Sequence, residues 1–100
     1  MANGMAKNSL TGAFTAAITG ASMCFFGPFN WFIWGTFVAT IQLERSFDAG
    51  VTWVPCTRGG VNSPVTGPIS DVATEPESGM LYRLNCTAYT SGTANWRLSQ

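Results

Sequence analysis

The eight residues from Ser46 to Trp53 constrain the fold more than any other part of the chain. They read Ser-Phe-Asp-Ala-Gly-Val-Thr-Trp, the S-x-D-x-G-x-T-W form of an Asp-box, a β-hairpin turn that many unrelated all-β proteins use. In such a turn Asp48 accepts hydrogen bonds from backbone amides, and Gly50 supplies a positive φ. Trp53 is expected to cover the turn, while Ser46 and Thr52 face each other across the two strands. The motif therefore predicts strand, tight turn and strand, with a structural role for all five residues.

Apolar and polar residues alternate along three further stretches, and this period of two is expected where one face of a strand meets a core. The stretches are residues 36–45, 80–89 and 93–99, and a short loop at 90–92 is expected to let the last stretch pair back on the one before it. The side chains predicted to face the core are Phe37, Ala39, Ile41 and Leu43, then Met80, Tyr82, Leu84, Cys86 and Ala88, and finally Ala94, Trp96 and Leu98.

Shorter segments complete the pattern. Residues 10–18 are predicted as a first strand, and residues 22–26 and 29–34 as adjacent strands split by a Gly27-Pro28 turn. Further along, the sequence predicts a return arm of the Asp-box hairpin at 51–57, a loop at 58–68, a short strand at 69–74 and a turn with an exposed acidic tip at 75–79.

These segments amount to about seven or eight short strands, with turn signals at the roughly 8–12-residue spacing that is typical of a sandwich or barrel. A chain of 100 residues forms one domain. We therefore expect an all-β fold, a compact antiparallel β-sandwich over residues 10–100 that is jelly-roll-like or immunoglobulin-like. Residues 1–9 are small and polar and are expected to form a flexible N-terminal arm, which in an assembly would reach a neighbouring subunit.

Charge is scarce in this chain. Charged residues make up 10% of it, against roughly 25% in typical soluble domains, and the formal net charge is zero. No net field would attract nucleic acid or an anionic membrane. The apolar stretch at 24–38 is shorter than the ~20 residues of a membrane span and is interrupted by Gly and Pro. Low charge favours association, so we expect subunit contacts, although a neutral β-domain solvated by Ser, Thr and Gly remains the alternative.

Catalytic and metal-binding residues are few. The chain contains no histidine, which removes the commonest general base and metal ligand, so Ser–His–Asp and Cys–His catalysis are excluded within this chain. Cys24, Cys56 and Cys86 lie far apart without a C-x-x-C spacing and are expected to be reduced and buried. We expect neither an enzyme nor a cofactor or metal site. The sequence shows no basic segment followed by an apolar one at its start, so we do not expect a secretory signal.

An acidic cluster and an aromatic run are the remaining candidate sites. Glu75 and Glu77, with Asp71 nearby, could act as paired carboxylates, but their place beside Pro76 predicts a solvated turn in which nothing raises a pKa. The aromatic run is the candidate subunit interface, since exposed aromatic patches mark contact surfaces; its members are Phe25, Phe26, Phe29, Trp31, Phe32 and Trp34.

The aromatic run has two alternative interpretations. In a strand Phe29, Trp31 and Ile33 would face one way and Asn30, Phe32 and Trp34 the other, so the run could equally be a strand buried on both faces. The second alternative is a carbohydrate-binding β-sandwich with a tryptophan platform made of Trp31, Trp34, Trp53 and Trp96.

The run from Gly35 through the Asp-box to Trp53 resembles small virion proteins of tailed bacteriophages. Residues 75–84, 86–89 and 97–99 are similar too, so the resemblance covers about the C-terminal two thirds of the chain. It implies a structural, non-enzymatic role in a particle assembled in the host cytoplasm, with no catalytic residues to carry over. Such proteins contact one another as trimers or larger rings and bind the major capsid protein or other virion subunits. The resemblance favours a capsid decoration (cement) protein, with a tail or neck component as the alternative.

Overall fold

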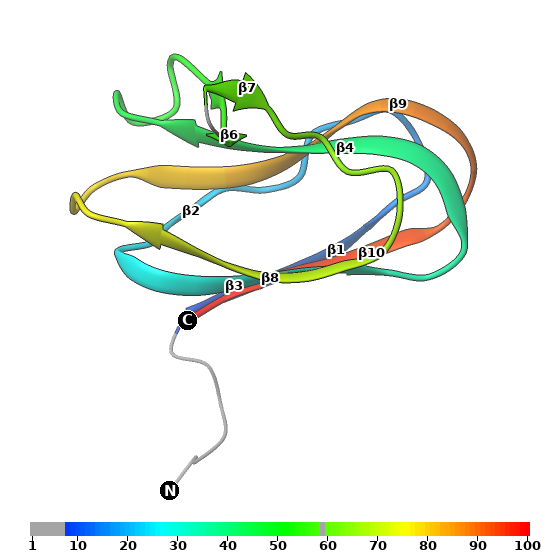
Figure 1. Ribbon diagram of the computed structural model, residues 1–100, viewed down its shortest axis with the longest axis horizontal. Helices are drawn as coiled ribbons and strands as arrows, with labels where there is room; N and C mark the ends of the chain where they lie inside the picture. The colour runs from blue at the N-terminus through cyan, green and yellow to red at the C-terminus, as the bar shows by residue number, and fades with distance from the viewer. Residues whose placement is uncertain (1–7, 59) are drawn as a thin grey trace, which may run out of the picture.

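The computed structural model describes residues 8–58 and 60–100 of the chain. They form an all-β fold in which two antiparallel sheets of four strands pack face to face (Figure 1). Sheet 1 has the strand order β1 (Ser9–Phe14), β10 (Ala94–Ser99), β3 (Gly27–Trp34) and β8 (Ile69–Glu75). Sheet 2 has the order β2 (Met23–Cys24), β9 (Leu81–Gly92), β4 (Phe37–Ser46) and β5 (Val54–Pro55). A small hairpin of β6 (Thr57–Arg58) and β7 (Val61–Asn62) lies above sheet 2.

The strand order is that of a jelly roll. When the eight strands of the two sheets are counted along the chain, sheet 1 contains the first, eighth, third and sixth, and sheet 2 the second, seventh, fourth and fifth. The first strand thus pairs with the eighth, the second with the seventh, the third with the sixth and the fourth with the fifth. This is one antiparallel ribbon rolled into two layers. The prediction of a compact antiparallel sandwich is confirmed. Of the two forms expected, jelly-roll-like and immunoglobulin-like, the strand order matches the jelly roll.

The Asp-box hairpin occupies the tip of this ribbon. It joins β4 to β5, and these are the only successive sheet strands among the described residues that lie in the same sheet. Every other connection between successive sheet strands crosses from one layer to the other. The return arm is shorter than the sequence predicts: the strand paired with β4 contains only Val54 and Pro55, and the Cys56 amide adds one backbone hydrogen bond to the Leu43 carbonyl at 2.8 Å.

Two of the crossings lie side by side and depend on glycine. Between β3 and β4 the chain turns at Gly35 (φ 115°), and between β9 and β10 it turns at Gly92 (φ 85°). The Thr93 amide donates to the Thr36 carbonyl at 3.0 Å and links the two corners. A Cβ on Gly92 would lie 2.2 Å from the Thr36 carbonyl oxygen. Only glycine therefore allows the two crossings to approach this closely, and they close one end of the sandwich (Figure 1).

The core fills the space between the sheets. Sheet 1 presents the inward positions of β3, which alternate with partly exposed ones, and sheet 2 presents those of β4 and β9. Ala94, Trp96 and Leu98 are buried as predicted. The large, fully buried apolar side chains are Phe14, Phe25, Phe29, Ile33, Ile41, Leu84 and Leu98.

Two strand pairings expected from the sequence are wrong. Residues 22–26 and 29–34 are not adjacent strands, because β2 lies in sheet 2 and β3 in sheet 1. Gly27 has φ 76° and begins β3, so the Gly27-Pro28 pair accompanies a change of sheet rather than a hairpin turn. Likewise β10 does not pair back on β9: it crosses at Thr93 and inserts between β1 and β3. The pattern of apolar residues gives the face of a strand but not its neighbour.

Ala88 is exposed, although alternation along residues 80–89 places it inward. Ile41 pairs with Cys86 and Thr40 pairs with Ala88, so Thr87 is an extra residue in β9. A bulge of this kind inserts one residue and reverses the faces beyond it. Tyr89 accordingly packs against the core in place of Ala88.

The predicted N-terminal arm divides at Asn8. Residues 1–7 lie outside the described part of the chain. Asn8 exchanges two backbone hydrogen bonds with Gln100, at 3.0 and 2.9 Å, and Ser9 pairs with Ser99. Ser9 therefore belongs to β1, and Asn8 is held beside the end of β10 by its bonds to Gln100, so neither residue is part of an arm.

Candidate functional site

The Asp-box turn forms a closed set of hydrogen bonds around two side chains. Asp48 accepts from the Thr52 amide at 2.7 Å and from the Ser46 hydroxyl at 2.8 Å. The Ser46 oxygen accepts in turn from the Gly50 amide at 2.9 Å. Gly50 has φ 91°, and the Trp53 indole donates to its carbonyl at 3.0 Å. Both hydrogen bonds to Asp48 end on its Oδ1 atom, which is consistent with a structural role for this carboxylate in the turn.

Trp53 also joins the turn to the sheet. The guanidinium of Arg83 lies 4.2 Å from the centre of a Trp53 ring and donates to Glu44 at 2.8 Å. Glu44 is buried and accepts a second hydrogen bond from Asn85 at 3.0 Å. Arg83 therefore links the Asp-box turn to sheet 2, because it stacks on Trp53 and pairs with the Glu44 carboxylate.

We expect Asp48→Ala to lower the melting temperature by several degrees, because the Thr52 amide and the Ser46 hydroxyl lose their shared acceptor. The hydrogen bonds from the Thr52 side chain and amide lower the pKa of Asp48, so the charged form is the one that the turn holds. Thermal denaturation followed by circular dichroism measures the effect. Asp48→Asn is the matched control, since its amide oxygen can still accept and it should lose clearly less stability. Equal melting temperatures for wild type and Asp48→Ala would contradict this account.

The candidate interface divides into buried and exposed members. Phe25, Phe29 and Trp31 are 0%, 1% and 5% exposed and belong to the core, so their assignment to an interface is wrong. Phe29 packs on Phe25 with ring centroids 4.8 Å apart. These side chains face inward because the inward positions of β3 must fill the space between the two sheets.

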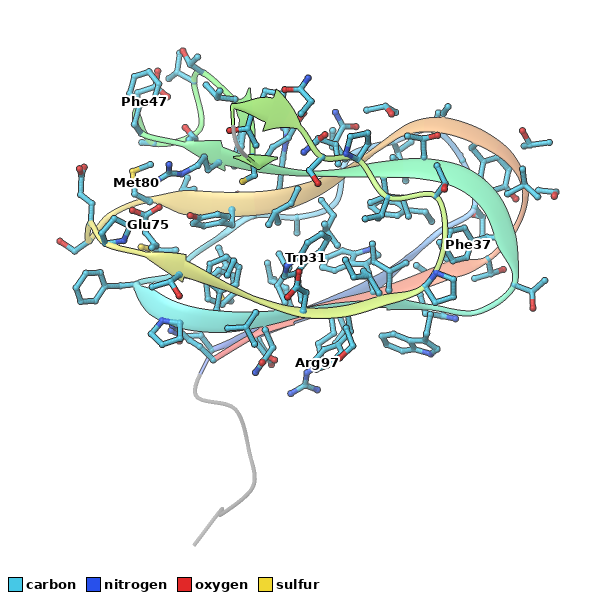
Figure 2. The ribbon with its side chains drawn as sticks, in the orientation of Figure 1. Trp31, Phe37, Phe47, Glu75, Met80 and Arg97 are labelled. Atoms are coloured by element: carbon cyan, nitrogen blue, oxygen red, sulfur yellow. The ribbon has the colours of Figure 1, made fainter. Side chains whose placement is uncertain are left out.

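The exposed members contribute to an apolar patch on the outer face of sheet 1. Trp34 is 48% exposed and Phe32 is partly exposed on the outward positions of β3. Arg97 is the cross-strand partner of Phe32 on β10, and its side chain points away from the sheet (Figure 2). Val72 on β8 is 58% exposed. We call Phe32, Trp34, Val72 and Arg97 the outer patch. Phe26 is also exposed, but it lies just before the first residue of β3 and is not counted in the outer patch.

A four-tryptophan sugar platform does not exist. Trp31 and Trp96 are buried in the core at 5% and 3% exposure, and Trp53 lies beneath the Asp-box turn. Of these four tryptophans, Trp34 is exposed and Trp53 is half-buried. Alternation along β3 and β10 places Trp31 and Trp96 on the inward face and Trp34 on the outward face.

Glu75 contradicts the expectation of a solvated acidic turn. It is 1% exposed at the end of β8 and pairs with Arg45. It accepts from the Tyr82 hydroxyl at 2.6 Å and from the Glu77 amide at 2.9 Å. Glu77 is exposed, as expected. The period of two could have revealed this difference, because Glu75 shares its strand face with Ile69 and Ala73.

We expect Glu75 to make the protein less stable in acid. Burial by itself would raise the pKa of Glu75, but hydrogen bonds from Tyr82, the Glu77 amide and Arg45 outweigh it and lower the pKa below its ordinary value of 4.5. A pKa lowered by folding contributes stability that is complete above the unfolded value and is lost as pH falls through the folded value. Urea unfolding from about pH 7 to about pH 3 should show a decline that begins near pH 4.5. The decline should be shallower in Glu75→Gln; an unchanged slope would contradict the assignment.

A cleft opens between the edge strands of the two sheets, where β8 ends sheet 1 and β5 ends sheet 2. Its main part has a volume of about 580 Å³ and is lined by Leu43, Arg45, Phe47, Val54, Met80 and Tyr82, among others. A smaller lobe of about 150 Å³ extends toward Trp31 and Gln42. Phe47 stands above Met80 and Glu75 at one end of the sandwich (Figure 2). No local pattern in the sequence indicates this cleft, because its walls come from segments that are far apart along the chain.

The cysteines are free thiols with different exposure. Cys86 is buried, Cys56 is half-buried beside the cleft and Cys24 is exposed on the edge strand β2, so the expectation of three buried cysteines fails for Cys24. Burial raises the pKa of the Cys56 thiol to about 11, which keeps it protonated at neutral pH. A protonated thiol is a poor nucleophile.

Neither a metal-binding cluster of three or more His, Cys, Asp or Glu residues nor a helix able to span a membrane occurs in residues 8–58 and 60–100. No protein-family model, curated protein or solved structure matches the chain.

Proposed function

We propose that this protein is a non-enzymatic structural component of a bacteriophage particle, and specifically a capsid decoration protein that stabilises the shell through subunit contacts. The observation that supports this function best is the outer patch. It places two aromatic side chains, a valine and an arginine on one exposed sheet face of a chain with zero net charge.

The chemistry of the patch is that of a protein contact. Aromatic residues and arginine are enriched in interfaces and in their hot spots, whereas Lys, Glu and Asp are depleted there. Arg45 pairs with Glu75 and Arg83 pairs with Glu44, but no carboxylate of the described residues forms a salt bridge with Arg97. A partner that supplies a carboxylate opposite Arg97 would complete the patch.

The fold agrees with this function by analogy. Jelly rolls include viral capsid domains and lectins, although a fold alone does not decide a function. The resemblance of residues 35–53, 75–84, 86–89 and 97–99 to small virion proteins favours the first of these two groups. Attachment would derive from apolar area buried at about 25 cal/mol per Å², with self-association into a homo-oligomer such as a trimer.

We expect Trp34→Ser and Arg97→Glu each to reduce the occupancy of the protein on phage capsids by at least about tenfold, since hot-spot truncations cost about 2 kcal/mol or more. Co-sedimentation with capsids measures occupancy, and mass photometry measures self-association. Val51→Ser is the matched control: Val51 is 84% exposed on the Asp-box turn, outside the patch.

Unchanged occupancy of both patch variants would contradict the role of the patch. Binding to tails but not to tailless capsids would replace decoration by the tail or neck alternative. A wild-type protein that binds neither would overturn the proposed function.

A further inference from the structure

The two sheets have four edge strands, and three of them are protected against pairing with another chain. β2 and β5 are only two residues long, and β5 contains Pro55. On β8 the charged Asp71 lies on the inward side, opposite buried Trp31, and its carboxylate accepts from the Val72 amide at 2.8 Å. Short strands, proline and inward-pointing charges are devices by which natural sheets avoid edge-to-edge contact.

The fourth edge strand, β1, has none of these devices. Its residues include neither a proline nor a charge, and no charged residue occurs between Asn8 and Leu43. It pairs with β10 in one continuous register, without a bulge. Residues 11–13 are exposed to solvent, so no described part of the chain covers them. An open, uncharged edge of this kind is a template for another strand.

The register identifies the unpaired backbone groups of this edge. Asn8 and Gln100 exchange both of their backbone hydrogen bonds, and hydrogen-bonded and non-hydrogen-bonded pairs alternate along an antiparallel ladder. The amides and carbonyls of Ser9, Thr11 and Ala13 therefore point away from β10, toward the open edge. None of these groups has a hydrogen-bond partner within residues 8–58 and 60–100.

This edge is complementary to itself. When a second copy is placed antiparallel to the first about a twofold axis at Thr11, the two Thr11 residues face each other. Ser9 of each copy then faces Ala13 of the other. All of these become hydrogen-bonded pairs, in which two residues exchange both amide-to-carbonyl bonds. The backbone groups that β1 leaves open are therefore the ones that a second β1 satisfies.

The side chains on the inward face fit the same arrangement. Leu10 is half-buried and packs against the core. Gly12 lies opposite Trp96, and a Cβ at Gly12 would lie 2.7 Å from the Trp96 ring. With the axis at Thr11, Leu10 of each copy is opposite Gly12 of the other, in the closely spaced type of pair. A large side chain thus meets a position that has none, and the exposed part of Leu10 becomes covered.

The outward face brings no like charges together. Arg97 is the cross-strand neighbour of Thr11 on β10. The two Arg97 residues would be three strand spacings apart, about 14 Å, which exceeds the Debye length of about 8 Å at physiological ionic strength. The two copies of sheet 1 would form one continuous sheet, with both outer patches on the same face.

We propose that two copies of this chain pair through their β1 edges, antiparallel about a twofold axis at Thr11, and so form a dimer with one continuous sheet. In its biological role this contact rests on the proposed function, whose self-association it specifies, but it can be measured on the chain alone. It favours a dimer over a trimer, because an isologous contact closes at two copies.

Thr11→Pro tests the contact by removing the amide at the axis from both copies. In sedimentation equilibrium from micromolar to millimolar concentration, wild type should dimerise, and the variant should associate at least about tenfold more weakly. Ser70→Pro is the matched control, because Ser70 is exposed on β8 and its amide, like that of Val72, points to the other edge of sheet 1. Proline is tolerated at edge positions whose amide faces solvent, so both variants should fold.

Thr11→Lys and Thr11→Glu test the position of the axis. Each variant places two like charges opposite each other, so each alone should dimerise more weakly than wild type. An equimolar mixture should recover dimers, because opposite charges then face each other. Hydrogen exchange followed by NMR reports the register: the amides of Ser9, Thr11 and Ala13 should be protected in the wild-type dimer and should lose this protection on dilution.

A wild-type chain that stays monomeric at millimolar concentration would overturn the proposal. Equal dimerisation of Thr11→Pro and wild type, or a mixture of the two charged variants that forms no dimer, would do the same. Protection of Ser9, Thr11 and Ala13 that appears only when capsids are added would show that a strand of another protein occupies the edge in place of a second copy.

This inference and the proposed function fail in different experiments. A dimer that has this contact but binds no phage particle would overturn the proposed function alone. A monomeric chain that still decorates capsids would overturn the dimer alone.

Discussion

Gly92→Ala is expected to destabilise the protein by about 3 kcal/mol or more, enough to remove much of the 5–15 kcal/mol that a small domain has. A non-glycine residue at a φ of 85° costs about 1–3 kcal/mol. The new Cβ would also lie 2.2 Å from the Thr36 carbonyl oxygen and 2.7 Å from the Phe37 Cα. Both contacts are with backbone, so the two crossings would have to separate. Urea denaturation should show the loss directly.

Gly79→Ala separates the two causes of that loss. Gly79 has a φ of 89°, almost the same as Gly92, but nothing lies within 4 Å of its Cβ position. We expect it to cost only about 1 kcal/mol, the strain of the backbone alone. If the two variants lost the same stability, close packing of the crossings would not be what requires glycine at position 92.

Glu75→Ala is expected to cost about 2–4 kcal/mol. Removing one partner of a buried ion pair leaves the other without compensation and typically costs 3–5 kcal/mol. Because the Arg45 side chain is 38% exposed, solvent screens part of that penalty. The Tyr82 hydroxyl and the Glu77 amide also lose their acceptor. The free energy of unfolding, measured in urea at neutral pH, reports the sum.

Glu77→Ala is the matched control, two residues away on the same turn. Its side chain is exposed, so we expect a change within about 0.5 kcal/mol. Similar effects for the two variants would mean that Glu75 is solvated in solution, as its position beside Pro76 first indicated.

The sequence predicted which residues form strands better than it predicted their partners. The buried positions of β10 and the inward side of β3 follow from alternation, a property of the strand itself. The outer patch was within reach too, because the same alternation separates Phe32 and Trp34 from Trp31. The pairing of strands could not be predicted from alternation. Neighbouring strands in the sequence were expected to pair, but β2 and β3 lie in different sheets, and so do β9 and β10. The positive φ of Gly27 and Gly92 accompanies these changes of sheet, and a glycine in a sequence does not distinguish a hairpin from a crossing.

The cleft and the Glu75 site depend on contacts over long sequence separations. Arg45 and Glu75 are 30 residues apart, and Arg83 and Glu44 are 39 apart. No local pattern in the chain joins them. The exposure of Cys24 could not be predicted from the sequence either, because it depends on β2 being an edge strand of sheet 2.

By itself the sequence determined the all-β class, the Asp-box hairpin and the inward faces of the long strands, because each of these follows from interactions within a few residues. The tertiary structure alone decided that the hairpin is the tip of a rolled ribbon, that Glu75 is buried and that a cleft opens between β5 and β8. Local patterns set the direction of a side chain relative to its own strand. Which strands lie opposite, and what remains uncovered between them, depends on how the two halves of the ribbon fold together.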